Sequence, residues 1–279
     1  MSHTVLLLVL LAAFLHAAWN ALLRSGGDRF WSVTVMSFTA ALTCIPAVVL
    51  LPLPLARAWP YVAVSGVVHI IYNLLLIRQY RQGDFGHTYP VARGSSPLLI
   101  AVGGVWFASE HLSATVFLGI ILVSIGILSL AFGAKAHVDS FFAAFTTGCS
   151  IAVYSVIDAL GARSAGNATA FTAWMVMGYG LTMPVVFRLA RPAGQKSFWR
   201  GDTRELLKAA GGGVVSVIAY GIVVWAMAHG PMGPVSALRE TSALFAVVMG
   251  CVFLKEKFTL QKIVAATLIV IGNITLHLA

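Results

Sequence analysis

The stretch RGSSPLLIAVGGVWFASEHL at residues 93–112 returns in altered form as RETSALFAVVMGCVFLKEKF at residues 239–258. Each copy begins with an arginine inside an apolar run and ends in a turn that contains a glutamate. Identical pairs 146 positions apart include Arg93 and Arg239, Ser96 and Ser242, Leu98 and Leu244, Gly104 and Gly250, Phe107 and Phe253, and Glu110 and Glu256. A repeat of this length predicts a duplicated chain.

The likeness extends to both sides of this segment. Further pairs are Leu122 and Leu268, Ile125 and Ile271, Gly126 and Gly272, then at an offset of 147 Gly66 and Gly213, Val67 and Val214, Ile71 and Ile218, and at an offset of 135 Ala17 and Ala152, and Trp19 and Tyr154. We therefore predict a single domain over residues 1–279, with repeat one at 1–134 and repeat two at 140–279.

Composition places this chain in a membrane. Of the 279 residues, 59% are apolar, 10% are charged, and the mean hydropathy is +0.91, whereas soluble domains have about 45–50% apolar and about 25% charged residues. A spanning helix needs about 20 apolar residues. Runs of this kind occur at Thr4–Leu23, Trp31–Leu51, Pro60–Ile77, Thr88–Phe107, Ala114–Phe132, Phe141–Leu160, Ala168–Leu189, Leu206–Ala228, Pro234–Leu254 and Lys262–Leu278.

Ten runs in two copies give five helices per copy. An odd number of helices makes the second copy enter the membrane from the opposite side. The predicted fold is therefore an all-α polytopic membrane protein with ten transmembrane helices as two inverted five-helix repeats. Such repeats place a site between the halves near the middle of the membrane and suit alternating access, so the architecture indicates transport.

The net charge of +9 comes from cations between the apolar runs, with a cluster from Arg188 to Lys208. Their distribution fits the positive-inside rule better than a nucleic-acid surface, so no nucleic-acid partner is expected. Counted over ten helices, the charge bias puts both termini outside the cell. The three cysteines, Cys44, Cys149 and Cys251, lie in apolar runs without metal-ligand spacing, so we expect neither disulfides, nor a metal site, nor a cofactor.

Polar side chains within the runs form stripes along single helix faces. In two runs a His, an aromatic residue and an Asn fall at i, i+3 and i+4, which places them on one face. The candidate substrate-binding residues are His16, Trp19, Asn20, Tyr72, Asn73, Tyr89, Arg93, Tyr154, Tyr220 and Arg239. Intramembrane polar groups are functional candidates by default, but helix-to-helix hydrogen bonding and aromatic packing explain several of them equally well.

Arg93 gives the sharpest prediction. A guanidinium stays charged and is costly inside a membrane unless it is paired or hydrated. No carboxylate lies within four residues of Arg93 in its own run. Its partner is therefore an anionic ligand, backbone carbonyls, or a side chain from another helix such as Asp158 or Glu240. Asp158 and Glu240 are also the candidates for ion pairing or for coupling to a proton, although Asp158 near the end of its run could equally be hydrated. Glu110 and Glu256 are expected to be solvated turn residues.

Four segments together resemble the EamA-type branch of the drug/metabolite transporter superfamily. They are HAAWN at residues 16–20, RQGDFGHTYPVARGSSPLL at 81–99, ALRETSALFAVVMG at 237–250 and FLKEKFT at 253–259. The resemblance implies ten helices in inverted repeats, a cavity formed mainly by the first, third, fourth, sixth, eighth and ninth helices, and the bacterial inner membrane. It also implies cytoplasmic termini, the reverse of the charge count.

The sequence thus predicts a secondary active transporter of a small polar, zwitterionic or anionic metabolite of the amino acid or phosphonate class. The alternative is polyspecific efflux of aromatic or cationic compounds. HExxH, GxSxG, CxxC and a GxxxxGK[ST] phosphate loop do not occur in the sequence, which argues against an enzyme and against direct ATP drive. The expected partners are a small-molecule substrate and the lipid bilayer, with the protein a monomer or a homodimer and proton coupling an option.

Overall fold

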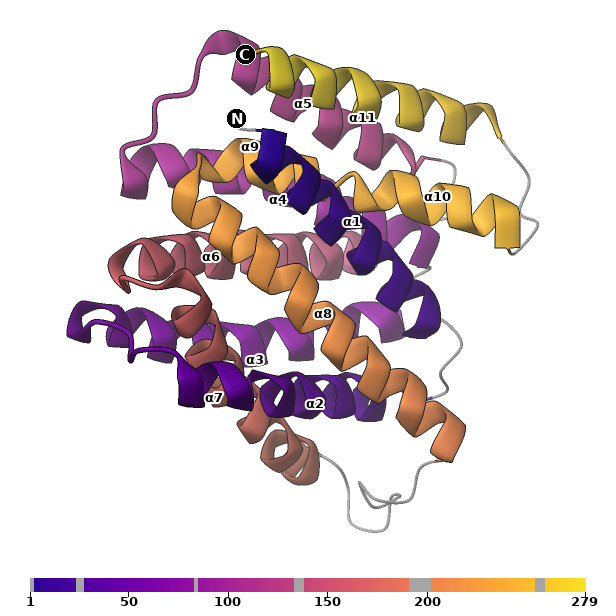
Figure 1. Cartoon of the computed structure of the whole chain (residues 1–279). Coiled ribbons are helices and arrows are strands. Elements are labelled where there is room, and N and C mark those ends of the chain that lie inside the picture. Colours follow the sequence, from indigo (N-terminus) through magenta and orange to yellow (C-terminus); the bar gives the residue numbers. More distant parts are fainter. Residues whose placement is uncertain (1–2, 24–27, 83–84, 133–137, 191–201, 254–258) are drawn as a thin grey trace.

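The computed structural model describes residues 3–23, 28–82, 85–132, 138–190, 202–253 and 259–279, and within them the regular structure is helical. The α-helices are α1 (His3–Leu23), α2 (Arg29–Leu50), α3 (Trp59–Gln82), α4 (Phe85–Ala108), α5 (Ala114–Ser129), α6 (Val138–Ser164), α7 (Ala168–Ala190), α8 (Thr203–His229), α9 (Met232–Arg239), α10 (Ser242–Phe253) and α11 (Leu260–Leu278) (Figure 1). A single 3₁₀ turn, η1 (Ala56–Ala58), precedes α3.

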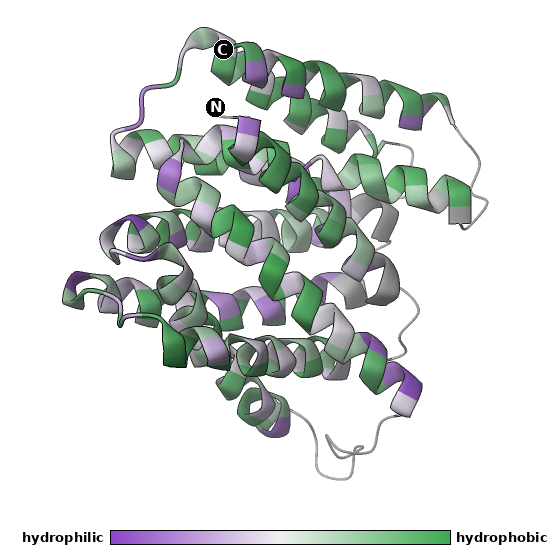
Figure 2. Ribbon diagram, viewed as in Figure 1, coloured by the Kyte–Doolittle hydropathy of each residue, from purple (hydrophilic) through white to green (hydrophobic). Residues whose placement is uncertain are grey.

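Eight of the described helices are long and apolar enough to cross a membrane, and α5 is a shorter apolar helix. Large apolar side chains such as Trp106 and Leu189 are about four-fifths exposed. Hydrophobic residues dominate the outer helices α5, α10 and α11 in Figure 2. Because water would not tolerate this much exposed apolar surface, the chain is a multi-pass membrane protein.

The helices pack in pairs that join distant parts of the sequence. Helix α2 lies against α7 and α8, α3 against α6 and α7, α1 against α8, and α5 against α11. The α5–α11 crossing is close because Gly119 and Gly272 face each other, where a β-carbon on either would approach the other's carbonyl oxygen to about 3 Å. Both termini lie at the same end of the molecule (Figure 1).

The predicted ninth run is two helices, not one. Glu240 and Thr241 form a turn between α9 and α10, in which Thr241 N–H bonds the Leu238 carbonyl at 3.1 Å and the Thr241 hydroxyl donates to the same oxygen at 2.7 Å. A threonine hydroxyl that takes a nearby carbonyl competes with the helical ladder, and the shorter i→i−3 bonds tighten the chain here. The Gly-containing runs of α3, α4 and α8, by contrast, are continuous helices.

Candidate functional site

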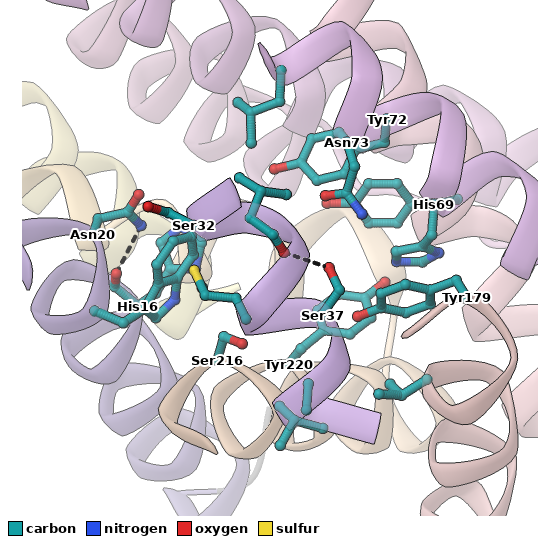
Figure 3. A pocket seen from close by; sticks show the side chains of 18 of the residues that line it. His16, Asn20, Ser32, Ser37, His69, Tyr72, Asn73, Tyr179, Ser216 and Tyr220 are labelled. Atoms are coloured by element: carbon teal, nitrogen blue, oxygen red, sulfur yellow. Dashed lines mark hydrogen bonds between the residues drawn. The ribbon is translucent and has the colours of Figure 1, made fainter. Parts of the chain in front are cut away.

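A cavity of about 130 Å³ lies among α1, α2, α3, α6, α7 and α8 (Figure 3). Seven of the predicted residues line it: His16, Trp19, Asn20, Tyr72, Asn73, Tyr154 and Tyr220. The remaining predicted residues, Tyr89, Arg93, Arg239, Glu240 and Asp158, lie outside this lining. The two polar stripes on α1 and α3 therefore face the same space.

Helix α1 contributes a compact group to the wall. Asn20 donates its amide to the His16 carbonyl at 2.8 Å, and the His16 and Trp19 rings meet edge to face with centroids 5.0 Å apart. The indole Nε1 of Trp19 is buried and has no hydrogen-bond partner among the described residues. A buried donor without a partner is unfavourable, so this N–H is a ready contact for a ligand.

Aromatic rings form the opposite wall. His69 stacks on Tyr179 with centroids 4.9 Å apart and an interplanar angle of 9°, and it also packs against Tyr154 at 4.3 Å. Tyr154 in turn meets the rings of Tyr72 and Tyr220 edge to face. These rings come from α3, α6, α7 and α8, so four helices share one aromatic surface.

Sequence reasoning missed the walls from α2 and α7. Arg29, Ser32, Met36 and Ala40 line the cavity from α2, and Tyr179 lines it from α7. The resemblance had pointed instead to the fourth and ninth helices. The signal for α2 was present, because these four residues recur at helical spacing on one face. Ser32, Met36 and Ala40 are small or apolar, however, and such residues are indistinguishable from ordinary packing.

A buried cluster of charged side chains lies outside the cavity lining, between α4 and the junction of α9 and α10. Arg93 Nε lies 2.7 Å from Glu240 Oε2, and Arg239 Nη2 lies 3.1 Å from Glu240 Oε1. Arg93 also donates to the Ser242 hydroxyl at 3.3 Å, and its guanidinium lies over the Tyr89 ring at 5.9 Å. All three charged side chains are at most 6% exposed. Of the partners considered for Arg93, which were a ligand, backbone carbonyls or a side chain from another helix, the structure supplies the carboxylate of Glu240.

The cluster lies at the break between α9 and α10. Arg239 is the last residue of α9, and Glu240, which follows it, keeps a right-handed helical conformation with φ −69° and ψ −7°. The Glu240 carboxylate reaches the neighbouring Arg239 and also Arg93 of α4. Two guanidinium groups and one carboxylate leave a net charge of +1.

Asp158 lies in a different environment from the one its position suggested. Helix α6 continues to Ser164, and the Asp158 side chain is fully buried rather than hydrated. Its carboxylate accepts hydrogen bonds from the Ser65 hydroxyl and, at 2.5 Å, from the Tyr220 hydroxyl. The imidazole of His69 lies nearby, with Nε2 3.9 Å from Asp158 Oδ2, and it forms an ion pair with the carboxylate only when it is protonated.

Glu110 is also not a solvated turn residue. Its carboxylate pairs with Arg163 at 2.5 Å and accepts the Met232 N–H at 2.9 Å, which caps the start of α9. Arg163 in addition donates to the carbonyls of Met227 at 3.0 Å and Gly230 at 2.7 Å, at the end of α8. This Arg163–Glu110 latch ties together α6, α8, α9 and the α4–α5 turn at the end where the termini lie. The matching Glu256 is outside the described residues.

The comparisons with known proteins agree with this architecture. The EamA-like transporter family model matches residues 140–277. The chain belongs to the EamA-like transporter family. A comparison with curated proteins finds no match. One crystal structure of another protein is similar over 100% of this chain and 99% of that chain, with a TM-score of 0.78 and 18% sequence identity, so the likeness shows the fold alone.

Membership of this EamA family makes the chain a membrane transporter of the drug/metabolite transporter superfamily rather than an enzyme. A transporter of this family acts on small molecules within a membrane, and the cavity between the helices offers room for one among the described residues. The polar, aromatic lining shows what chemical groups a ligand would meet there.

Proposed function

We propose that this EamA-family protein is a secondary active transporter that moves a small polar metabolite through the central cavity by alternating access, in the bacterial inner membrane. The observation that carries the proposal is the cavity itself, which is lined by helices of both predicted halves. The substrate is zwitterionic or anionic, of the amino acid or phosphonate class.

Exchangeable packing of the halves supports the inverted repeat. If each helix of repeat one is replaced by its counterpart in repeat two, the pair α1–α8 becomes α6–α3, and α2–α8 becomes α7–α3, and all four pairs occur. The matched glycines follow the same rule, since Gly213 of α8 faces α2 and Gly66 of α3 faces α7. The family match over 140–277 coincides with the predicted second repeat.

A difference between the two ends of the cavity supports alternating access. The cavity lining includes Arg29, the first residue of α2, at the end of the helices opposite the termini. At the end with the termini, the Arg163–Glu110 latch closes the junction of α6, α8 and α9. Exchange of roles between the halves would open this latch and close the far end.

The buried charges favour a substrate with a negative group. The Arg93–Arg239–Glu240 cluster carries a net charge of +1 and acts electrostatically on His16, which lines the cavity. On the other side, Asp158 interacts electrostatically with Tyr179 and Tyr220 of the aromatic wall. A zwitterion lying with its anionic end toward Trp19 Nε1 and Asn20 would follow this field.

The aromatic wall favours a second candidate, efflux of aromatic or cationic compounds. The rings of His69, Tyr72, Tyr154, Tyr179 and Tyr220 suit flat ligands or cations. The net positive cluster opposes a cation, and for that reason we place this candidate second.

A ligand screen followed by an exchange assay tests the proposal. Purified protein is screened by thermal shift against amino acids, phosphonates, nucleobases and quaternary amines, because a ligand that binds the folded state raises its melting temperature. Each stabilising compound is then loaded into proteoliposomes, and entry of its radiolabelled form is measured at equal pH on both sides. Exchange of an amino acid or phosphonate supports the proposal. Exchange confined to aromatic cations supports the second candidate, and no exchange of any stabilising compound rejects transport.

A further inference from the structure

Glu240 and Asp158, the fully buried carboxylates among the described residues, differ in the groups that surround them. Glu240 meets two guanidinium groups, so adding a proton to it would leave two buried cations without a counter-charge. Asp158 meets two hydroxyl groups and one histidine. An ionised carboxylate away from a permanent cation is the unfavourable form in a membrane interior, so Asp158 can take up a proton without stranding another charge.

We propose that the Asp158–His69 pair is the site that binds the proton coupled to substrate movement, and that Glu240 is a structural counter-ion. The inference rests on the proposed transport function and deepens it. A proton from water in the cavity reaches Asp158 Oδ2 by way of His69, and it leaves by the same pair when the cavity opens to the other side of the membrane. An O–H bond forms at Asp158 Oδ2 as an N–H bond of His69 breaks, His69 takes up a proton from water in turn, and no electrons are transferred.

The cavity gives this pair its access to water. Asp158 itself is fully buried, but both His69 and Tyr220 line the cavity and contact its carboxylate. His69 Nδ1 is held by the Ser65 hydroxyl at 3.1 Å and the Ser65 carbonyl at 3.0 Å, which leaves Nε2 directed to Asp158. A histidine between water and a buried carboxylate is suited to pass a proton.

The groups around Asp158 come from every helix packed near it. Helix α3 supplies Ser65 and His69, α8 supplies Tyr220, α7 supplies Tyr179, and α6 itself supplies Tyr154 and, further along, Arg163. Arg163 is engaged by Glu110 and by two carbonyls, Arg57 by the Ser164 carbonyl, and Arg93 of α4 by Glu240. Among the described residues, therefore, no lysine or arginine forms an ion pair with Asp158.

Protonation would change the hydrogen bonds that join the two halves. An ionised carboxylate only accepts, so it holds both the Ser65 and the Tyr220 hydroxyls. Once one oxygen carries a proton it must donate, and the hydroxyl on that oxygen must turn to accept or separate. Ser65 belongs to the first predicted half, and Asp158 and Tyr220 belong to the second, so the proton acts at the contact between halves.

Infrared difference spectroscopy of purified protein, taken between neutral and acidic pH, tests the proton site without a substrate. We expect a protonated-carboxyl band on acidification that is lost in Asp158→Asn and retained in Asp139→Asn, which removes an exposed carboxylate on the same helix. Tyr220→Phe, which removes one hydroxyl donor, should shift the pH at which the band appears. If Asp158→Asn does not fold, this shift is the decisive readout. A band that persists in Asp158→Asn, or a Tyr220→Phe band that does not shift, overturns the proposal.

The second measurement uses proteoliposomes and a stabilising amino acid or phosphonate from the screen. A gradient of about one pH unit should produce up to roughly tenfold accumulation for one proton per substrate, and Asp158→Asn should abolish this accumulation while Asp139→Asn keeps it. Accumulation driven by a sodium gradient instead overturns the proton assignment. Exchange at equal pH that proceeds in wild type without any response to a pH gradient rejects coupling but leaves transport intact, whereas absence of exchange rejects transport itself.

Discussion

The Glu240 cluster and the Asp158 cluster each contain a fully buried carboxylate. The two carboxylates differ in the kind of side chain that binds them. Glu240 is neutralised by Arg93 and Arg239, both permanent cations. Asp158 accepts hydrogen bonds from two hydroxyl groups and lies near one histidine. All of these groups can change between donating and accepting a hydrogen bond. Burial alone therefore does not identify a functional acid, because the partners decide whether its charge is fixed.

The two clusters also differ in their access to the cavity. No residue of the Glu240 group lines the cavity, whereas His69 and Tyr220 line it and contact Asp158. The first cluster therefore influences a ligand through its field, and the second influences it through groups that a ligand or water can touch. Changes in the first should affect stability and charge selectivity, and changes in the second should affect pH dependence.

Loss of Glu240 should have the largest effect. Glu240→Ala leaves two buried guanidinium groups unpaired, and breaking a buried ion pair from one side costs about 3–5 kcal/mol. We expect a large fall in melting temperature and in the yield of monodisperse protein, measured by thermal unfolding in detergent. The control is Asp139→Asn, which removes an exposed carboxylate. A melting temperature equal to that of the control would contradict the structural role of Glu240.

Arg93→Ala should have a smaller effect on stability and a clear effect on selectivity. Glu240 keeps Arg239 at 3.1 Å, so the carboxylate is not left unpaired, and the net charge of the cluster falls from +1 to zero. We expect loss of anion exchange by about tenfold or more, with cation exchange retained, because the favourable field is removed. The measurement is exchange of an amino acid or phosphonate and of a quaternary amine in the same vesicles. Loss of cation exchange with anion exchange retained would reverse the substrate assignment.

The sequence predicted most of the fold because membrane helices leave a strong signal. Nine of the ten runs correspond to one helix each. The duplication around Arg93 and Arg239 stays a prediction of which helices are counterparts. The break at Glu240–Thr241 was not predictable from hydropathy, because the run stays apolar on both sides of it. At the break, the Thr241 hydroxyl donates to the Leu238 carbonyl, and Glu240 pairs with Arg93 and Arg239.

The site was predicted in part, and for a physical reason. Stripes on one helix can be read from spacing, so His16, Trp19 and Asn20 were found together. Contacts between helices depend on packing angles that spacing does not give. The pairing of Asp158 with Tyr220, the latch from Glu110 to Arg163 and the α2 wall all belong to this second kind.

Weakening of the Arg163–Glu110 latch should moderately favour the state in which the end of the molecule near the termini is open. Glu110→Gln removes the charge that pairs with Arg163 and weakens the cap on Met232 N–H. Because the Arg163 side chain is 27% exposed, we expect only about 1 kcal/mol, or roughly a fivefold change in population. Hydrogen exchange at the ends of α6 and α8 should become faster in Glu110→Gln and remain unchanged in Asp139→Asn. Equal exchange in both variants would mean that the latch does not hold this end closed.

Removal of the Trp19 N–H should have the smallest effect, and it separates binding from folding. Trp19→Phe keeps an aromatic ring in the wall and removes a buried donor that has no partner among the described residues. Stability should therefore not fall through a lost hydrogen bond, while a ligand that accepts from this N–H should bind about five- to tenfold more weakly, since one neutral hydrogen bond contributes about 1 kcal/mol. The dissociation constant of a stabilising ligand, measured by titration calorimetry, checks this. Trp106→Phe is the matched control, because Trp106 is 77% exposed and far from the lining. Unchanged affinity in Trp19→Phe would show that the substrate's anionic end lies elsewhere, and the orientation derived from the two charged clusters would have to be reversed.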